Sequence, residues 1–152
     1  SNCMDPGSLL SLWVWVNIMS FSNLSKYYTC LPYNIQKQIA QSVESHHAAL
    51  KNHLHALSVV RNKCAHGGRL YNVKFNPPVK LERSFLKKNS AIKNYSLFAV
   101  IYTITKYLPN HREKVLFKEQ LLQLLKKYQD SVDKSLIGFQ DNWYDLLKIQ
   151  TK

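Results

Sequence analysis

Residues 46–66 restrict the fold of this chain most, because they predict one long amphipathic helix with a defined end. Apolar side chains recur three or four positions apart, as they do along one face of an α-helix. They are Leu50, Leu54, Leu57 and Cys64, with Val60 at the edge of the same stripe. Gly67 and Gly68 follow at once, and glycine readily adopts the left-handed backbone that ends a helix. We therefore predict a helix that stops at this glycine pair.

The rest of the chain also favours helices, since only four glycines and five prolines interrupt 152 residues. Helices are predicted over about residues 34–43 and over residues 90–108. A further helix begins after Asn110, because Asn110 and Glu113 form a variant of the capping box. Together these helices predict an all-α bundle.

Three segments are less regular. Residues 9–19 fit either a buried helix or a strand. Residues 67–89 form a connection rich in Lys and Arg, which is long enough to carry function or to pack as an extended arm. Residues 137–150 predict a turn and a short terminal helix.

The composition fits one globular domain over residues 9–150, with 45% hydrophobic and 12% aromatic residues. Residues 1–8, SNCMDPGS, are typical of an expression remnant or a disordered end. The apolar run at residues 9–19 is about half of the ~20 residues that cross a bilayer, so no transmembrane segment is expected, and a membrane is not among the expected partners. The cysteines Cys3, Cys30 and Cys64 lack CxxC spacing, which disfavours disulfides and zinc and predicts a reduced, cytoplasmic setting.

The charge balance favours a polyanionic partner. Lys and Arg number 21 against 9 Asp and Glu, which gives a formal net charge of +12. A surface so short of carboxylates attracts polyanions and speeds their arrival. Nucleic acid is therefore the leading candidate partner, and by charge alone an anionic membrane surface is the second.

The stretch RNKCAHGGRLYN, residues 61–72, places reactive side chains at the end of the long helix. Each helical residue turns about 100°, so Arg61 lies about 20° from the direction of Leu50, inside the apolar stripe. A buried guanidinium needs an anionic partner, which the neighbouring sequence hardly offers. His66 lies about 140° around the helix from Arg61, whereas Asn62 shares its flank. Either the helix unwinds at His66, or a second subunit completes the site.

These side chains suit metal-independent cleavage of RNA. Imidazole titrates near pH ~6.5, so His66 can take a proton from a 2′-hydroxyl or return one to the leaving oxygen. Arg61 can hold the phosphate and stabilise transition-state charge, and Asn62 can orient the imidazole or the substrate. The spacing alone also fits a structural role, with Arg61 in a core ion pair and His66 as a cation at the helix C-terminus.

Four histidines lie near the start and middle of the predicted helix: His46, His47, His53 and His55. No acidic residue completes a metal site with them. We therefore predict solvated histidines, and neither a metal nor another cofactor.

The motif resembles the signature of Abi-like proteins, the abortive-infection group of the HEPN superfamily: an Arg-Asn pair, then Cys-Ala-His, then Arg-Leu-aromatic-Asn. Residues 12–28, LWVWVNIMSFSNLSKYY, resemble the family's Trp-containing helix and Ser-Phe-Gly-x-Leu-Ser turn. Residues 138–143, GFQDNW, are similar to its Gly-Phe-Pro-x-x-Trp ending. Because family members tend to be longer, the chain resembles the C-terminal part of such a protein or a truncated relative.

The resemblance implies a HEPN four-helix bundle with additional helices, which dimerises and cleaves RNA in phage defence or in a toxin–antitoxin system. It implies Arg61 and His66 as the catalytic pair, with Asn62 as the polar residue after the arginine. Further substrate contacts are expected from Lys63, Arg69 and Tyr71. The expected partners are RNA, a second copy of the chain and an antitoxin or regulatory protein.

Two positions depart from the family pattern. Asn17 stands where relatives commonly carry Glu, and Ser22 stands where a glycine follows Ser-Phe. Loss of that carboxylate removes an obvious partner for Arg61 or His66. Two alternatives therefore stay open: a non-catalytic RNA- or nucleotide-binding module, and a dimerisation domain whose activity lies in a further N-terminal part.

Overall fold

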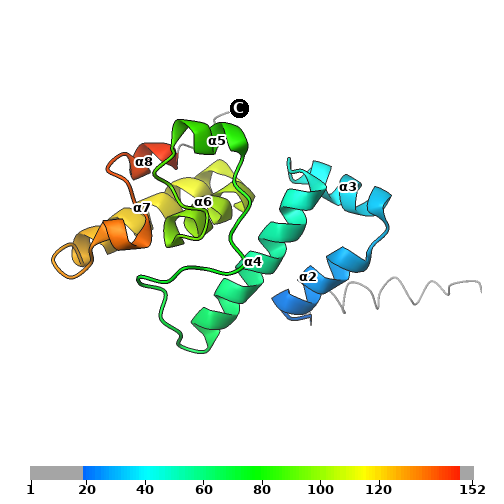
Figure 1. The fold of residues 1–152 in the computed structure, drawn as a ribbon, viewed down its shortest axis with the longest axis horizontal. Helices are drawn as coiled ribbons and strands as arrows, with labels where there is room; N and C mark the ends of the chain where they lie inside the picture. Colours follow the sequence, from blue (N-terminus) through cyan, green and yellow to red (C-terminus); the bar gives the residue numbers. More distant parts are fainter. Residues whose placement is uncertain (1–18, 148–152) are drawn as a thin grey trace, which may run out of the picture.

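The computed structural model describes residues 19–147, which form helices joined by turns and one long loop, with no strand among them (Figure 1). The helices before the loop are α2 (Phe21–Cys30), α3 (Tyr33–Ser42) and α4 (His47–Ala65). Those after it are α5 (Arg83–Lys88), α6 (Leu97–Tyr107), α7 (His111–Lys127), the 3-10 helix η1 (Lys134–Ile137) and α8 (Trp143–Leu146). The predicted all-α class is confirmed. The HEPN type of bundle stays a prediction, and the question of helix or strand at residues 9–18 lies outside the described residues.

Helix α4 is the central element of the fold. It packs against α2 and α3 on one side and against α6 on the other (Figure 1). The helices predicted at residues 46–66 and 34–43 are confirmed as α4 and α3. No helix within residues 19–147 is long and apolar enough to cross a membrane.

Three buried clusters hold the helices together. The cluster between α2, α3 and α4 contains Tyr28, Ala40 and Leu50. The cluster between α4, the loop and α6 contains Ala56, Val60, Phe75, Val79, Ala99 and Val100. The cluster between α6 and the C-terminal segment contains Ile92, Phe98, Ile137, Phe139, Trp143 and Leu147. Because α4 contributes to the first two, its position fixes the whole arrangement.

The predicted apolar stripe of α4 is only partly correct. Leu50 and Val60 are buried, and Leu54 and Leu57 are half-buried. Cys64 is exposed, because the last turn of α4 projects beyond the residues that cover the rest of the helix. The end of this helix is therefore open to solvent.

The connection after α4 packs as an extended arm, as one of the two predictions for residues 67–89 proposed. Phe75 and Val79 are buried, and their backbone N–H groups donate to the carbonyls of Tyr95 (2.8 Å) and Asn94 (3.0 Å). Helix α5 lies within this range, so it is not a loop throughout.

The predicted helix over residues 90–108 begins too early. Residues 90–96 form turns, and α6 starts only at Leu97. The carbonyls of residues 94 and 95 bond to the arm and cannot serve a helix. Ser96 then caps α6, with its Oγ accepting from the Ala99 N–H at 3.2 Å. Pairing with the arm overrides the local helical pattern.

The two later elements follow the sequence closely. Asn110 caps α7, and its Oδ1 accepts from the Glu113 N–H at 2.9 Å. Gly138 adopts the left-handed region with φ 83°, and α8 follows it. Both the predicted cap and the predicted turn with a short helix are confirmed.

Candidate functional site

The two glycines end α4 in a defined way. Gly67 has φ 64°, and its N–H donates to the Cys64 carbonyl at 3.0 Å. The Gly68 N–H reaches back to the Lys63 carbonyl at 2.7 Å. This pair of bonds is the Schellman motif. A Cβ on Gly68 would lie 2.6 Å from Lys63 Cγ, so the turn needs a glycine there. His66 consequently sits at the C-cap, just beyond the last helical residue, with φ −96° and ψ 18°.

Arg61 and Asn62 lie in the last turns of α4, and the structure brings their side chains together. Arg61 Nη1 donates to Asn62 Oδ1 at 3.1 Å, and Asn62 Nδ2 donates to Ser22 Oγ at 2.8 Å. Arg61 is exposed, and in the described part of the chain no carboxylate pairs with it. The structural alternative of a core ion pair is therefore wrong for Arg61 within residues 19–147. Its guanidinium faces solvent, whereas the neighbouring Asn62 is half-buried.

His66 is exposed and stands apart from this pair. Its backbone N–H donates to the Asn62 carbonyl at 3.1 Å, but its ring forms no hydrogen bond or ion pair with residues 19–147. The helix ends at the residue where one of the two sequence predictions expected it to unwind. The structure therefore joins Arg61 to Asn62 and leaves the imidazole of His66 free to meet a ligand or a second subunit.

The residues expected to touch the substrate differ in their surroundings. Arg69 is exposed and Lys63 is half-buried against Gly68. Tyr71 packs against the C-terminal cluster, and its hydroxyl accepts from the Asp133 N–H at 3.1 Å. Tyr71 thus has a structural partner, while substrate contact by all three residues stays a prediction.

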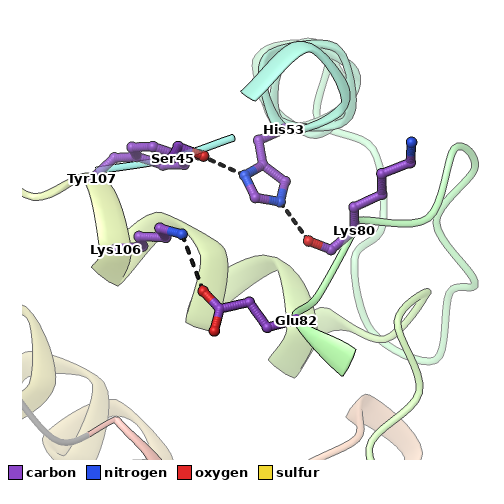
Figure 2. Close-up of polar contacts among 6 residues, drawn as sticks. All are labelled: Ser45, His53, Lys80, Glu82, Lys106 and Tyr107. Atoms are coloured by element: carbon purple, nitrogen blue, oxygen red, sulfur yellow. Dashed lines mark hydrogen bonds and ion pairs between the residues drawn. The ribbon is translucent and has the colours of Figure 1, made fainter. Parts of the chain in front are cut away.

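A second polar cluster surrounds His53, at the junction of α4, α6 and the arm (Figure 2). The ring is only 4% exposed, with Nδ1 2.6 Å from the Tyr107 hydroxyl and Nε2 2.7 Å from the Lys80 carbonyl. A carbonyl only accepts, so Nε2 carries the proton and Nδ1 accepts from Tyr107. Ser45 Oγ lies 3.3 Å from the same hydroxyl and donates to it. Burial lowers the pKa of His53, although the bond to the Lys80 carbonyl opposes this effect.

The prediction of solvated histidines is wrong for His53. It lies three residues after Leu50 and seven before Val60, both of which are buried, so helical spacing already placed it on the covered face. The prediction holds for His55, which is exposed. His46 is also exposed and caps α4, since its Nδ1 accepts from the Ala48 N–H at 3.3 Å.

A pocket of about 640 Å³ lies beside His53. Its lining includes Glu82 and Lys106, which form an ion pair at 3.4 Å (Figure 2). Arg61, Asn62 and His66 do not line it, so the motif lies on a different part of the surface. In the region from residue 19 to residue 147, no group of three or more His, Cys, Asp or Glu residues could hold a metal ion.

The family model of Abi-like proteins matches residues 2–72, just under half of the chain. The matched part includes α2, α3, α4 and all of RNKCAHGGRLYN, whereas GFQDNW at residues 138–143 lies outside it. Comparison with curated proteins and with solved structures gave no match. The relation to the HEPN superfamily stays a prediction. The motif, its helix and the two preceding helices all fall within the match, so this part of the chain is similar to Abi-like proteins.

Proposed function

We propose that the chain is a metal-independent endoribonuclease that acts in bacterial abortive infection. The match of residues 2–72 to the family model of Abi-like proteins supports a role in this form of phage defence. The observation that carries the nuclease proposal is the end of α4, where an exposed guanidinium without a carboxylate partner lies one to two turns from an exposed imidazole. In the cleavage of an RNA phosphodiester, a guanidinium can hold the phosphate and an imidazole can act as general acid or base.

In the proposed reaction, the ribose 2′-oxygen forms a bond to phosphorus and the bond from phosphorus to the 5′-oxygen breaks. His66 takes the proton of the 2′-hydroxyl, and the imidazole of a second copy of the chain returns a proton to the leaving 5′-oxygen. Arg61 holds the phosphate oxygens and stabilises the charge that they gain in the transition state. A homodimer supplies both imidazoles and removes the need for Arg61 and His66 of one helix to point the same way.

The surrounding cations support an RNA substrate. Lys63 and Arg69 flank His66, and neither forms an ion pair within residues 19–147. We propose that they contact phosphates on either side of the cleaved bond, while an antitoxin or another regulatory protein restrains the enzyme before infection.

The proposal is tested with a labelled mixed RNA pool in the presence of EDTA. Wild type should cleave it, and His66→Ala should be slower by at least about a hundredfold, which is the usual contribution of a general acid or base. The matched control is His55→Ala, which removes another exposed histidine from the same helix. Equal rates for wild type and His66→Ala would refute the assignment.

A non-catalytic RNA-binding module is the second candidate, favoured by Asn17 at the position where relatives commonly carry a carboxylate. In that case RNA binds without being cut, and its affinity falls steeply with salt as counterions are released. Filter binding between about 50 and 200 mM salt, run beside the cleavage assay, separates the two functions.

A further inference from the structure

We propose that Ser22 is a positioning residue, which fixes the Asn62 amide and, through it, the Arg61 guanidinium. The three side chains form one line of hydrogen bonds, from Arg61 Nη1 to Asn62 Oδ1 (3.1 Å) and from Asn62 Nδ2 to Ser22 Oγ (2.8 Å). The catalytic consequence rests on the proposed ribonuclease function. The positioning itself is measurable without RNA.

The chemistry of the three groups sets the orientation of the amide. A guanidinium has only donors, so the atom of Asn62 that faces Arg61 has to be the acceptor Oδ1. The Nδ2 group then faces Ser22, whose hydroxyl oxygen accepts. A flipped Asn62 amide would place its NH₂ against the guanidinium, with donor facing donor. Arg61 therefore sets the orientation of the amide, and Ser22 holds the amide in that orientation by accepting from Nδ2.

Ser22 is anchored more firmly than the residue that it positions. It is the second residue of α2, whose N-terminus is capped by Ser20, with Oγ accepting from the Asn23 N–H at 3.2 Å. Helix α2 packs along α4, so the bond to Asn62 joins two packed helices. Asn62 is half-buried between them, whereas Arg61 is exposed. The packed helices therefore restrict the rotamers of Arg61 through Asn62, whereas a free arginine side chain would sample many rotamers.

The arrangement leaves Arg61 equipped to bind a phosphate. One N–H of its guanidinium is engaged by Asn62, and the other N–H groups stay available for a forked contact with an anion. Because the fork is planar, fixing one N–H restricts the directions in which the remaining donors can point. The hydroxyl of Ser22 therefore influences the direction in which the Arg61 guanidinium meets the phosphate, although Ser22 does not contact the substrate.

Nuclear magnetic resonance of the free protein tests the positioning. We expect the Asn62 side-chain amide protons to exchange with water several-fold faster in Ser22→Ala, and the Arg61 Nε–H to become more mobile on the picosecond-to-nanosecond timescale. Ser22→Thr keeps the hydroxyl and should restore both signals. The matched control is Ser84→Ala, because Ser84 is also the second residue of a helix and is exposed. Unchanged Asn62 exchange in Ser22→Ala would overturn the proposal.

Cleavage assays test the consequence. A lost hydrogen bond of ordinary strength predicts a kcat lower by roughly three- to tenfold in Ser22→Ala, with recovery in Ser22→Thr. In an Asn62→Ala background the same change should have no further effect, because Ser22 acts through Asn62. Ser22→Gly is a second variant without the hydroxyl, in case Ser22→Ala folds poorly.

The two proposals fail in different ways. If wild type does not cleave RNA while the resonances of Asn62 and Arg61 respond to Ser22→Ala, the ribonuclease function is wrong and the positioning stands. If wild type cleaves and Ser22→Ala cleaves at the same rate, or lowers kcat equally with and without Asn62, the positioning role is wrong.

Discussion

Replacing His53 by phenylalanine should destabilise the protein strongly, because the ring is buried and both of its nitrogens are hydrogen-bonded. Phenylalanine has a similar volume, so the loss of polar partners dominates. The Lys80 carbonyl loses its bond to the ring, and the Tyr107 hydroxyl keeps only Ser45. One lost partner in a buried place costs about 1–3 kcal/mol. Because the Tyr107 hydroxyl retains Ser45, the second loss is smaller, and the two together predict a loss of roughly 2–4 kcal/mol.

The assay is thermal and urea unfolding at pH 7.5, followed by circular dichroism. For a chain of this length the loss corresponds to a melting temperature lower by roughly 5–15 °C. His55→Phe is the matched control, since His55 is exposed on the same helix and its replacement should change stability by less than about 0.5 kcal/mol. If His53→Phe and His55→Phe unfolded at the same temperature and urea concentration, the stabilising role of the hydrogen bonds around His53 would be refuted.

The same side chain predicts a pH dependence. Burial lowers the pKa of His53 in the folded protein, so the unfolded chain binds the proton first as the pH falls below about 6.5. The stability that neutral His53 contributes is therefore fully present above that pH. It decreases as the pH falls, until the pH reaches the lowered pKa of His53 in the folded protein. His53→Phe lacks this contribution, so the stability difference from wild type should shrink between pH 7.5 and pH 5. A stability difference between His53→Phe and wild type that stays the same from pH 7.5 to pH 5 would contradict this pH dependence.

Two pairs of substitutions test the ends of the helices. Gly138→Ala should lower the melting temperature more than Gly67→Ala: both glycines have positive φ, but only at residue 138 would a Cβ meet another side chain, 2.5 Å from Ser96 Cβ. A melting temperature lower in Gly67→Ala than in Gly138→Ala would contradict the close packing at Gly138. Asn110→Ala should cost about 1 kcal/mol through the lost cap of α7, whereas Asn142→Ala should cost less, because Asn142 forms no side-chain cap bond. Equal losses in urea unfolding would count against the cap.

Helix α4 could be predicted because its signals are local. Apolar spacing marks its length, and Gly67 and Gly68 mark its end within the same short stretch. The cap of α7 at Asn110 is equally local. Such features depend on neighbours three or four residues away, which the sequence displays directly.

The errors come from contacts between distant residues. The start of α6 depends on the arm, because the N–H groups of Phe75 and Val79 donate to the carbonyls of Tyr95 and Asn94, which lie 20 and 15 residues further along the chain. The exposure of Cys64 depends on where the neighbouring helices stop covering α4. Neither fact is visible in the periodicity of a single segment, because tertiary packing overrides local preference.

The candidate site shows the same division. Arg61, Asn62 and His66 could be selected from their chemistry and from the resemblance to the Abi-like signature. Their partners could not, since the bond between Asn62 and Ser22 joins residues 40 positions apart. The sequence marked Ser22 only as a departure from the family pattern, and the structure places its hydroxyl against the motif.

The most direct measurement of the central proposal is the chemistry of the RNA ends. Wild-type protein is incubated with a defined single-stranded RNA and EDTA, and the fragments are examined by mass spectrometry. Attack by the 2′-oxygen predicts 2′,3′-cyclic phosphate and 5′-hydroxyl ends, which should be absent with His66→Ala and present with His55→Ala. Intact RNA after incubation with folded wild type, or the same ends produced by His66→Ala at the wild-type rate, would contradict the proposed function.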